Sequence, residues 1–343
     1  MAKFSEVLTI VNGRNQKQVV CDDGKYPIYG SGGIMGYAND YICKAETVVI
    51  GRKGSINKPI FVETPFWNVD TAFGLCANSE KLNPKYLYYF CEKFDFEKLN
   101  TTVTIPSLTK SNLLNVEIPL PNLEKQKQIV ELLDKVTSLI FLRKQQLSKL
   151  DELVKARFVE MFGEPIGNPM GWKRVRFDSI SENLDSKRVP VTESDRKDGV
   201  YPYYGASGIV DWINDYIFDE DILLVSEDGA NLLMRSTPIA FSVSGKSWVN
   251  NHAHVVRFRD FATQKFIEVY FSLIDISEYI TGTAQPKLNQ AKLNTMLFCW
   301  PPLSLQKQFV AFVERVDQQK QTVQQSLEKL ELMKKALMQE YFG

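Results

Sequence analysis

The chain has little histidine and little cysteine, and this restricts the chemistry it could perform. Its only histidines are His252 and His254, and its five cysteines, at positions 21, 43, 76, 91 and 299, form no C-x-x-C pair. A zinc site takes three or four ligands, and the neighbouring sequence does not supply them. Nothing near the histidines resembles a nucleophile elbow. We interpret them as a structural, hydrogen-bonding pair on one face of a strand, and the cysteines as typical of a reduced, cytoplasmic protein.

Long apolar runs and an excess of one charge sign are also missing. No segment approaches about 18 consecutive apolar residues, and residues 1–17 lack the apolar core of a signal peptide, so neither a membrane span nor secretion is indicated. Lysine plus arginine and aspartate plus glutamate balance at 41 each. Net charge therefore does not indicate nucleic-acid binding, and any contact with a polyanion must come from local patches.

Two segments resemble nucleotide-binding loops but lack essential residues. Residues 30–36 read GSGGIMG, with Met35 where the dinucleotide fingerprint needs glycine. Residues 240–247 have a spacing close to Walker A, but Ala240 replaces the first glycine and a strand-like segment follows instead of a helix. We favour turns over nucleotide binding at both places. No methyltransferase box is present either, so the sequence predicts no catalytic constellation.

Two segments of about forty residues, free of proline and glycine, share a heptad pattern and end at Gly163 and Gly343. The first seam contains Leu133, Val136, Ile140, Arg143, Leu147, Leu150, Val154, Arg157 and Met161. The second, offset by 180 positions, contains Val313, Val316, Lys320, Val323, Leu327, Leu330, Lys334, Leu337 and Tyr341. Each predicted helix is on the order of 55 Å long and needs a partner along its length. The cations of one seam never align with those of the other, which favours pairing of the two helices with each other.

The remainder of the chain is duplicated as well. Residues 26–41 recur as 201–216, the short apolar run 47–50 recurs as 222–225, and the segment from Trp67 recurs from Trp248. The apolar runs predict buried strands, and aromatic helices are expected at 86–90 and 266–274. Each half is therefore an α+β unit, strand-rich, followed by one long helix. The predicted boundaries are 1–121, 122–163, 164–301 and 302–343.

Four shared elements in a fixed order, repeated twice, resemble the specificity subunits of type I restriction-modification systems. They are the Tyr-Pro-x-Tyr-Gly block, the Trp-x-x-x-x-Ala element, the polar loop that ends in Pro-x-Leu, and the Pro-x-Leu-x-x-Gln-Lys-Gln entry to each long helix. The resemblance implies two target recognition domains in pseudo-two-fold tandem repeat, each reading part of a bipartite double-stranded DNA target, with the helices paired as an antiparallel coiled coil. It implies docking of modification subunits, which use S-adenosylmethionine, and of motor-nuclease subunits, which use ATP, on a chain that catalyses nothing and holds no cofactor.

Two such globules separated by paired helices would form a dumbbell, and the gap in its target would reflect helix length. The halves diverge between the shared elements, so we expect an asymmetric target. One departure concerns residues 51–54, GRKG, which correspond to the acidic SEDG at 226–229. A phosphate contact by Arg52 or Lys53 therefore does not transfer to the second half.

Candidate DNA-facing residues lie in polar loops, where Arg and Lys can contact phosphates and Asn, Gln, Ser and Arg can read bases. In the first half they are Tyr29, Ser31, Arg52, Lys53, Lys58, Thr104, Ser107 and Lys110. In the second half they are Tyr204, Ser207, Asn231, Arg235, Lys246, Gln285 and Lys287. Two alternatives remain open: a coiled-coil adaptor without DNA binding, and a restriction or modification enzyme with its own active site.

Overall fold

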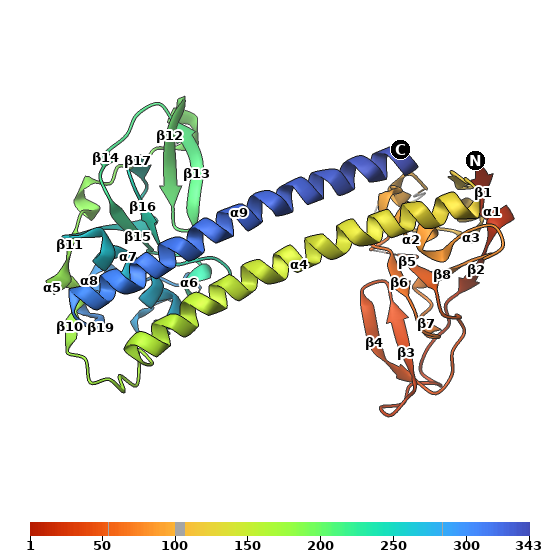
Figure 1. Cartoon of the computed structure of the whole chain (residues 1–343), viewed down its shortest axis with the longest axis horizontal. Helices are drawn as coiled ribbons and strands as arrows, with labels where there is room; N and C mark the ends of the chain where they lie inside the picture. Colours follow the sequence, from red (N-terminus) through yellow and green to blue (C-terminus); the bar gives the residue numbers. More distant parts are fainter. Residues whose placement is uncertain (54, 100–106, 283) are drawn as a thin grey trace. The chain divides into compact units, whose positions relative to one another are not determined.

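The computed structural model describes residues 1–53, 55–99, 107–282 and 284–343, and the chain divides into two compact units (Figure 1). Unit 1 comprises Met1–Gln145 and Gln324–Gly343, and unit 2 comprises Gln146–Val323. Each unit therefore contains its own segments of both long helices, α4 (Leu123–Phe162) and α9 (Leu303–Phe342). The two units have the same architecture, and we describe them one at a time.

Unit 1 is built on two sheets. Its elements are β1 (Ala2–Lys3), α1 (Phe4–Val7), β2 (Leu8–Asn12), β3 (Tyr26–Gly30), β4 (Gly33–Ala38), β5 (Thr47–Gly51), β6 (Ile60–Val62), β7 (Trp67–Asn68), β8 (Ala72–Ala77), α2 (Pro84–Lys93), the 3-10 helix η1 (Phe96–Leu99), α3 (Lys110–Leu114) and β9 (Glu117–Ile118). An antiparallel sheet has the order β2-β8-β5-β6. A second sheet has the order β4-β3-β7, with β3 and β7 parallel, and β1 pairs with β9.

In the described residues, unit 2 repeats this topology with one further edge strand, one further short α-helix and two further 3-10 helices. Its elements are β10 (Arg174–Arg176), α5 (Phe177–Ile180), β11 (Ser181–Asn183), η2 (Asp185–Lys187), η3 (Glu193–Asp195), β12 (Asp198–Gly205), β13 (Gly208–Ile213), β14 (Phe218–Asp219), β15 (Ile222–Ser226), α6 (Asn231–Met234), β16 (Ala240–Val243), β17 (Lys246–Val249), β18 (Ala253–Phe258), α7 (Phe261–Leu273), η4 (Ser277–Tyr279), α8 (Gln290–Thr295) and β19 (Leu297–Cys299). The sheets are β11-β18-β15-β16, β13-β12-β17-β14 and β10-β19.

The central strands β5 and β15 are buried along their whole length, as their branched apolar residues predict. Each is flanked by antiparallel neighbours on both sides. The glycine-rich segment 30–36 is a hairpin turn, and Gly33 and its counterpart Gly208 have φ of +120° and +125°. The Walker-like segment 240–247 forms β16, a turn with Gly245 at φ +75°, and the start of β17. The turn interpretation is confirmed at both places.

The repeated tryptophans explain the Trp-x-x-x-x-Ala element. The indole N–H of Trp67 donates to the carbonyl of Arg14 at 3.0 Å, and that of Trp248 donates to the carbonyl of Val189 at 2.6 Å. Each bond attaches the loop that precedes the first hairpin strand to the short strand β7 or β17. The alanine five residues later is fully buried at the start of β8 or β18, where a larger side chain would not fit.

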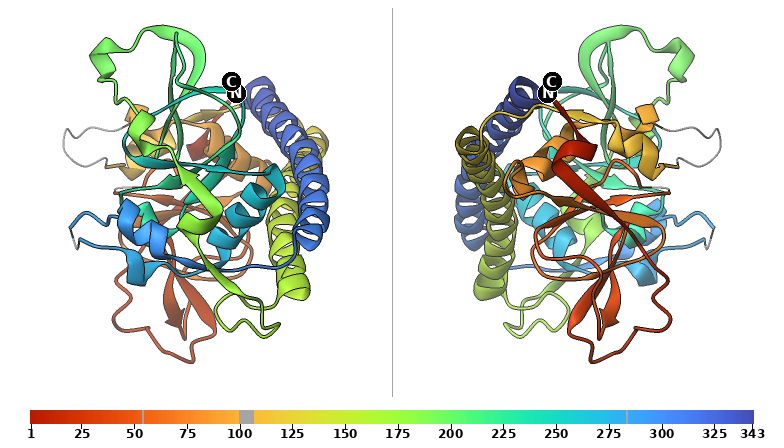
Figure 2. Two further views of the ribbon diagram at one scale, coloured as in Figure 1. Left: turned by 90° about the vertical axis from the view of Figure 1, so that its left-hand side faces the viewer. Right: turned by 90° about the vertical axis from the view of Figure 1, so that its right-hand side faces the viewer.

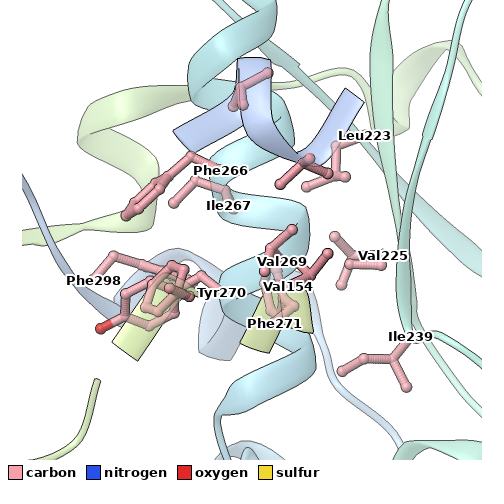
Figure 3. Close-up of a cluster of buried hydrophobic side chains, with 14 of the residues drawn as sticks. Val154, Leu223, Val225, Ile239, Phe266, Ile267, Val269, Tyr270, Phe271 and Phe298 are labelled. Atoms are coloured by element: carbon pink, nitrogen blue, oxygen red, sulfur yellow. The ribbon is translucent and has the colours of Figure 1, made fainter. Parts of the chain in front are cut away.

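The helix that follows the main sheet begins at a capped position in both units. The side chain of Asn83 accepts the backbone N–H groups of Lys85 and Tyr86, and that of Asp260 accepts the N–H of Thr263. In unit 2, α7 lies between the main sheet and the long helices (Figure 2). Figure 3 shows Leu223 and Val225 of β15 facing α7.

The long helices run antiparallel to each other within each unit. In unit 1, Lys144 pairs with Glu331 at 2.8 Å. In unit 2, Lys320 pairs with Asp151, and the ring of Phe158 near the end of α4 packs against Phe309 near the start of α9. The antiparallel pairing predicted for the helices is confirmed. Both lysines of the seam, Lys320 and Lys334, place their ammonium groups on carboxylates. Lys334 pairs with Glu92 of α2 at 2.7 Å.

The burial along the helices departs in part from the predicted seam. Ile140 and Leu147 are only half-buried, whereas Phe158 and Phe162 are almost fully buried. These two rings extend the seam into the core of unit 2. None of the helices in the described part of the chain is long and apolar enough to cross a membrane.

Candidate nucleic-acid interface

In each unit, the turn of the first hairpin lies against the loop that follows the central strand. The hydroxyl of Ser226 donates to the carbonyl of Ala206 in the hairpin turn of unit 2. In unit 1 the backbone of Gly51 approaches the hairpin so closely that an added Cβ would lie 3.0 Å from the Cβ of Ser31. The same added atom would lie 2.6 Å from the carbonyl oxygen of Ser55, which accounts for glycine at this position.

The polar loop ahead of α3 or α8 completes the surface. In unit 1, Lys53 forms an isolated β-bridge with Ser107, and the N–H of Leu108 donates to the carbonyl of Arg52 at 2.9 Å. Unit 1 thus brings four of the candidate residues, Ser31, Arg52, Lys53 and Ser107, together. Arg52, Lys53 and Lys58 are exposed, and the Arg52 guanidinium lies over the ring of Phe73 at 5.7 Å.

In unit 2 the corresponding loops line a hollow of about 450 Å³. Its lining includes the predicted residues Ser207 and Asn231, together with Asp228, Asn250 and His252. Both carboxylate oxygens of Asp228 lie 3.0 Å from Nδ1 of His252. The hollow therefore presents a carboxylate, two amides, a hydroxyl and an imidazole, which are groups suited to base edges.

A cluster of charged side chains adjoins this hollow through Glu227, the residue before Asp228. The carboxylate of Glu227 accepts from the guanidinium of Arg188 at 2.7 Å and pairs with the ammonium of Lys287 at 3.1 Å. Nδ1 of His254 lies 2.6 Å from Asp185, and its Nε2 lies 2.7 Å from the carbonyl oxygen of Leu288. We name these residues, Asp185, Arg188, Glu227, His254 and Lys287, the charged cluster.

The charges in the cluster compensate one another. Burial raises the pKa of Glu227, but the hydrogen bonds from Arg188 and Lys287 and the charge of His254 lower it by more, so the pKa is below its ordinary value. Burial likewise opposes ionisation of Asp185, and the hydrogen bond and charge of His254 bring its pKa below the ordinary value. Both carboxyl groups are therefore held as carboxylates.

Asp185, Glu227 and His254 each offer an atom within 4.8 Å of the others, which is close enough for a metal ion. Both ring nitrogens of His254 face oxygen acceptors, however, and an imidazole that donates from both has no lone pair for a metal. The carboxylates are already paired with Arg188 and Lys287. We interpret the cluster as an ion-pair network. His252 and His254 are hydrogen-bonded structural residues as predicted, but His252 precedes strand β18 instead of sharing its face.

Two further predicted residues, Lys110 and Tyr29, have side-chain contacts within unit 1. The ammonium of Lys110 donates to the carbonyl of Ile10 at 2.9 Å, which attaches α3 to β2. The ring of Tyr29 packs edge-on against Phe66 and is half-buried. Thr104 is outside the described residues.

In unit 2, the guanidinium of Arg235 donates to the carbonyls of Phe271 and Ile274 at 3.0 and 2.7 Å, which caps the end of α7. Burial lowers the pKa of Arg235. The ammonium of Lys246 lies over the rings of Tyr216 and Tyr201 at 4.6 and 5.8 Å, and these tyrosines raise its pKa.

The remaining two residues of unit 2 differ in exposure. Tyr204 is half-buried beside Phe241, and burial raises its pKa. Gln285 is exposed in the loop that contains Lys287. Of the predicted set in this unit, Ser207 and Asn231 share the hollow.

Asp228, His252 and Asn250 line the hollow but were not among the candidates from the sequence, which favoured cations and turn residues. A signal was available: Asp228 occupies the position that Lys53 has in the first repeat, and we excluded phosphate contact there without asking what else a carboxylate could contact.

Comparisons with known proteins agree with this architecture. The family described as "Type I restriction modification DNA specificity domain" matches residues 1–152 and 169–332. A Haemophilus influenzae protein with the provisional name of a type I restriction enzyme specificity subunit is 32% identical over 148 residues, which cover 43% of this chain and 37% of that protein. The MjaVIII specificity subunit of Methanocaldococcus jannaschii is 23% identical over 334 residues, covering 86% of this chain and 75% of that protein.

Solved structures show the same fold. The crystal structure of a type I restriction-modification system S subunit from M. genitalium matches with a TM-score of 0.66 and 15% identity, covering 100% of this chain and 95% of that one. A structure from work on complex assembly and conformational transition of the type I system matches with a TM-score of 0.56 and 15% identity, covering 99% and 96%. With the family match extending over both repeats, the chain belongs to the family of type I restriction-modification DNA specificity proteins.

Proposed function

We propose that this chain is the DNA-reading subunit of a type I restriction-modification complex, and that each unit reads one part of an asymmetric, bipartite target. The main support for the proposal is that the two units share one fold but present different charged side chains at the same loop. Their strand orders correspond, yet the loop after the central strand contains Arg52 and Lys53 in unit 1 and Glu227 and Asp228 in unit 2. Two units with the same fold but different polar side chains in their loops suit two different half-sites.

The exposed cations of unit 1 supply the electrostatic part of this function. Arg52 and Lys58 lie in the connection between β5 and β6 and are exposed. Such side chains position a protein on phosphates, and each phosphate contact makes the affinity fall as salt rises. The overall balance of charge in the chain does not oppose this, because phosphate contacts depend on the local patch.

The long helices serve as a spacer and as a docking surface in this proposal. Leu132, Leu139 and Leu142 of α4 are 38%, 44% and 53% exposed within unit 1. Their spacing of seven and three residues places them on one side of the helix, next to the seam. An apolar stripe beside a helix pair is suited to the packing of further helices, and we assign it to the modification subunits.

Methyl transfer and cleavage belong to the partner subunits in this proposal, and the chain itself is a binding scaffold. The test is to express it with its modification subunit in a host that lacks other methyltransferases, and to sequence the methylated sites. A motif of two unlike parts with a constant gap is the expected result. Methylation by the purified chain alone with S-adenosylmethionine would show that the chain has its own active site. If the purified complex does not retain DNA at low salt, the chain is a coiled-coil adaptor without DNA binding.

A further inference from the structure

Lys53 and Asp228 occupy the same position in the two repeated folds. Lys53 bridges Ser107 of the polar loop, and Asp228 bridges Lys287 of the corresponding loop. The residue before each accepts a backbone N–H from that loop: Leu108 donates to Arg52 at 2.9 Å, and Leu288 donates to Glu227 at 2.8 Å.

A third backbone bond agrees with this equivalence. The N–H of Arg52 donates to the carbonyl of Thr71 at 2.8 Å, and the N–H of Glu227 donates to the carbonyl of His252 at 2.9 Å. Both acceptors lie in the turn just before the strand β8 or β18. The backbone is the same, so the difference between the two positions is the side chain: a hydrogen-bond donor in unit 1 and an acceptor in unit 2.

Asp228 is held in a fixed place at the hollow of unit 2. The N–H of Gly229, the next residue, donates to the carbonyl of Pro286 at 3.0 Å. Glu227, the preceding residue, is bound by Arg188 and Lys287 in the charged cluster. The loop is therefore attached on both sides of Asp228, and its carboxylate is positioned before any ligand arrives.

The carboxylate retains capacity for a ligand. His252 contacts both of its oxygens at 3.0 Å, but an ionised carboxylate has about four acceptor sites. The Asp228 side chain is 17% exposed, and it lines the hollow with Ser207, Asn231 and Asn250. Acceptor sites of the carboxylate therefore remain available in a polar hollow on a DNA-reading unit.

We propose that Asp228 is a base-reading residue that selects an amino donor, cytosine N4 or adenine N6, in the half-site of unit 2, and that Lys53 selects an acceptor base at the equivalent place in the half-site of unit 1. This inference rests on the proposed function. A carboxylate is repelled by phosphates, so its favourable contact with DNA is an amino group on a base edge. An ammonium in the same geometry meets the acceptors of guanine or thymine instead. His252 orients the Asp228 carboxylate and is a positioning residue.

The test compares methylated motifs of cells that express the chain with its modification subunit. In Asp228→Asn the amide keeps an acceptor for His252 but adds a donor, so one position in one half of the motif should relax, with discrimination falling about 5- to 150-fold. In Asp228→Lys that same position should change to guanine or thymine. Lys53→Asp should change the equivalent position of the other half to cytosine or adenine. Asp198→Asn, an exposed acid in β12, is the matched control and should leave the motif unchanged.

The outcomes separate this inference from the function on which it rests. If the wild-type chain gives no bipartite motif, the proposed function is wrong. If it gives one, and both Asp228 variants methylate the same motif with the same discrimination, Asp228 is a structural partner of His252 only and the inference is overturned. If a variant methylates nothing, sequences bound by its purified complex are selected from a randomised duplex library, and the same two outcomes are read from the selected positions.

Discussion

Gln126 accepts the backbone N–H of Asn83 at 2.8 Å and is fully buried at the start of α4. Its amide donates in turn to the carbonyls of Lys81 and Pro121 at 3.0 and 2.8 Å. Gln306 repeats this role at the start of α9, where it donates to Pro301 and accepts from the hydroxyl of Thr263. The repeated Gln in the entry to each long helix therefore fastens that helix to the N-terminus of α2 or α7.

Gln126→Ala should destabilise unit 1, because it removes the partner of one part-buried N–H and of two part-buried carbonyls. We expect a loss on the order of 1–3 kcal/mol in the free energy of unfolding per unsatisfied group, reduced where water can enter. Chemical denaturation followed by circular dichroism measures it. Gln128→Ala, an exposed position in the same motif, should change stability by less than about 0.5 kcal/mol. Equal effects of both variants would contradict the assigned role.

Phe158→Ala should be among the most damaging substitutions in unit 2. The ring is 1% exposed and its centroid lies 5.0 to 5.5 Å from those of Phe162, Phe266, Tyr270 and Phe309. Removing it creates a cavity, and we expect a loss of about 3–5 kcal/mol. Phe141→Ala on the same helix is the control, since this ring is 59% exposed and its removal should cost little. A small effect at Phe158, measured by thermal unfolding, would show that the site collapses around the cavity.

The free energy of unfolding of unit 2 should decrease at acidic pH. The carboxyl groups of Asp185 and Glu227 have pKa values below their ordinary values of 3.8 and 4.5 in the folded chain. Groups of this kind bind protons more tightly in the unfolded state, so their contribution is complete above the ordinary pKa values and is lost as pH falls through the lower, folded ones. Hydrogen exchange of β18 and of residues 284–288 between pH 6 and pH 3 would report it. Asp185→Asn should flatten this dependence, whereas Asp22→Asn at an exposed position should not.

Lys58→Gln should weaken binding to DNA of any sequence. An exposed lysine that contacts a phosphate releases a counterion, so its removal should reduce the slope of log K against log salt by about one unit. Titration of the purified complex with duplex DNA at several salt concentrations measures this slope. Lys127→Gln removes the same charge from the exposed face of α4 and should leave the slope unchanged. Equal changes in both variants would indicate a nonspecific effect of net charge.

Lengthening both long helices should widen the gap in the target. Seven added residues after Gln145 and seven after Val323 preserve the heptad seam and extend each helix by about 10 Å. At roughly 34 Å per ten base pairs, this corresponds to about three additional base pairs between the half-sites. Sequencing of methylated sites would show the new gap with both half-sites unchanged. An unchanged gap would mean that the helices do not set the spacing.

The sequence was sufficient for the fold because the fold depends on patterns that occur twice. The apolar runs of β5 and β15, the aromatic helices and the heptad seams are local signals, and each repeat supports the interpretation of the other. The candidate site was predicted less well. Arg235 looked like a phosphate-binding cation in a loop, but the carbonyls of Phe271 and Ile274 that it caps are distant in sequence. Lys110 and its acceptor Ile10 are likewise a hundred residues apart.

The sequence by itself determined the tandem repeat, the α+β units and the pair of long helices, because periodicity and turn residues act over a few positions at a time. Only the tertiary structure decided which polar side chains are free to meet a ligand. It joined Asp185, Glu227 and His254 into one cluster, and it placed Asp228 in a hollow with Ser207 and Asn231. The physical reason is that a charged group is satisfied by whatever partner the fold brings within about 3 Å, and that partner is set by the packing of distant strands and loops.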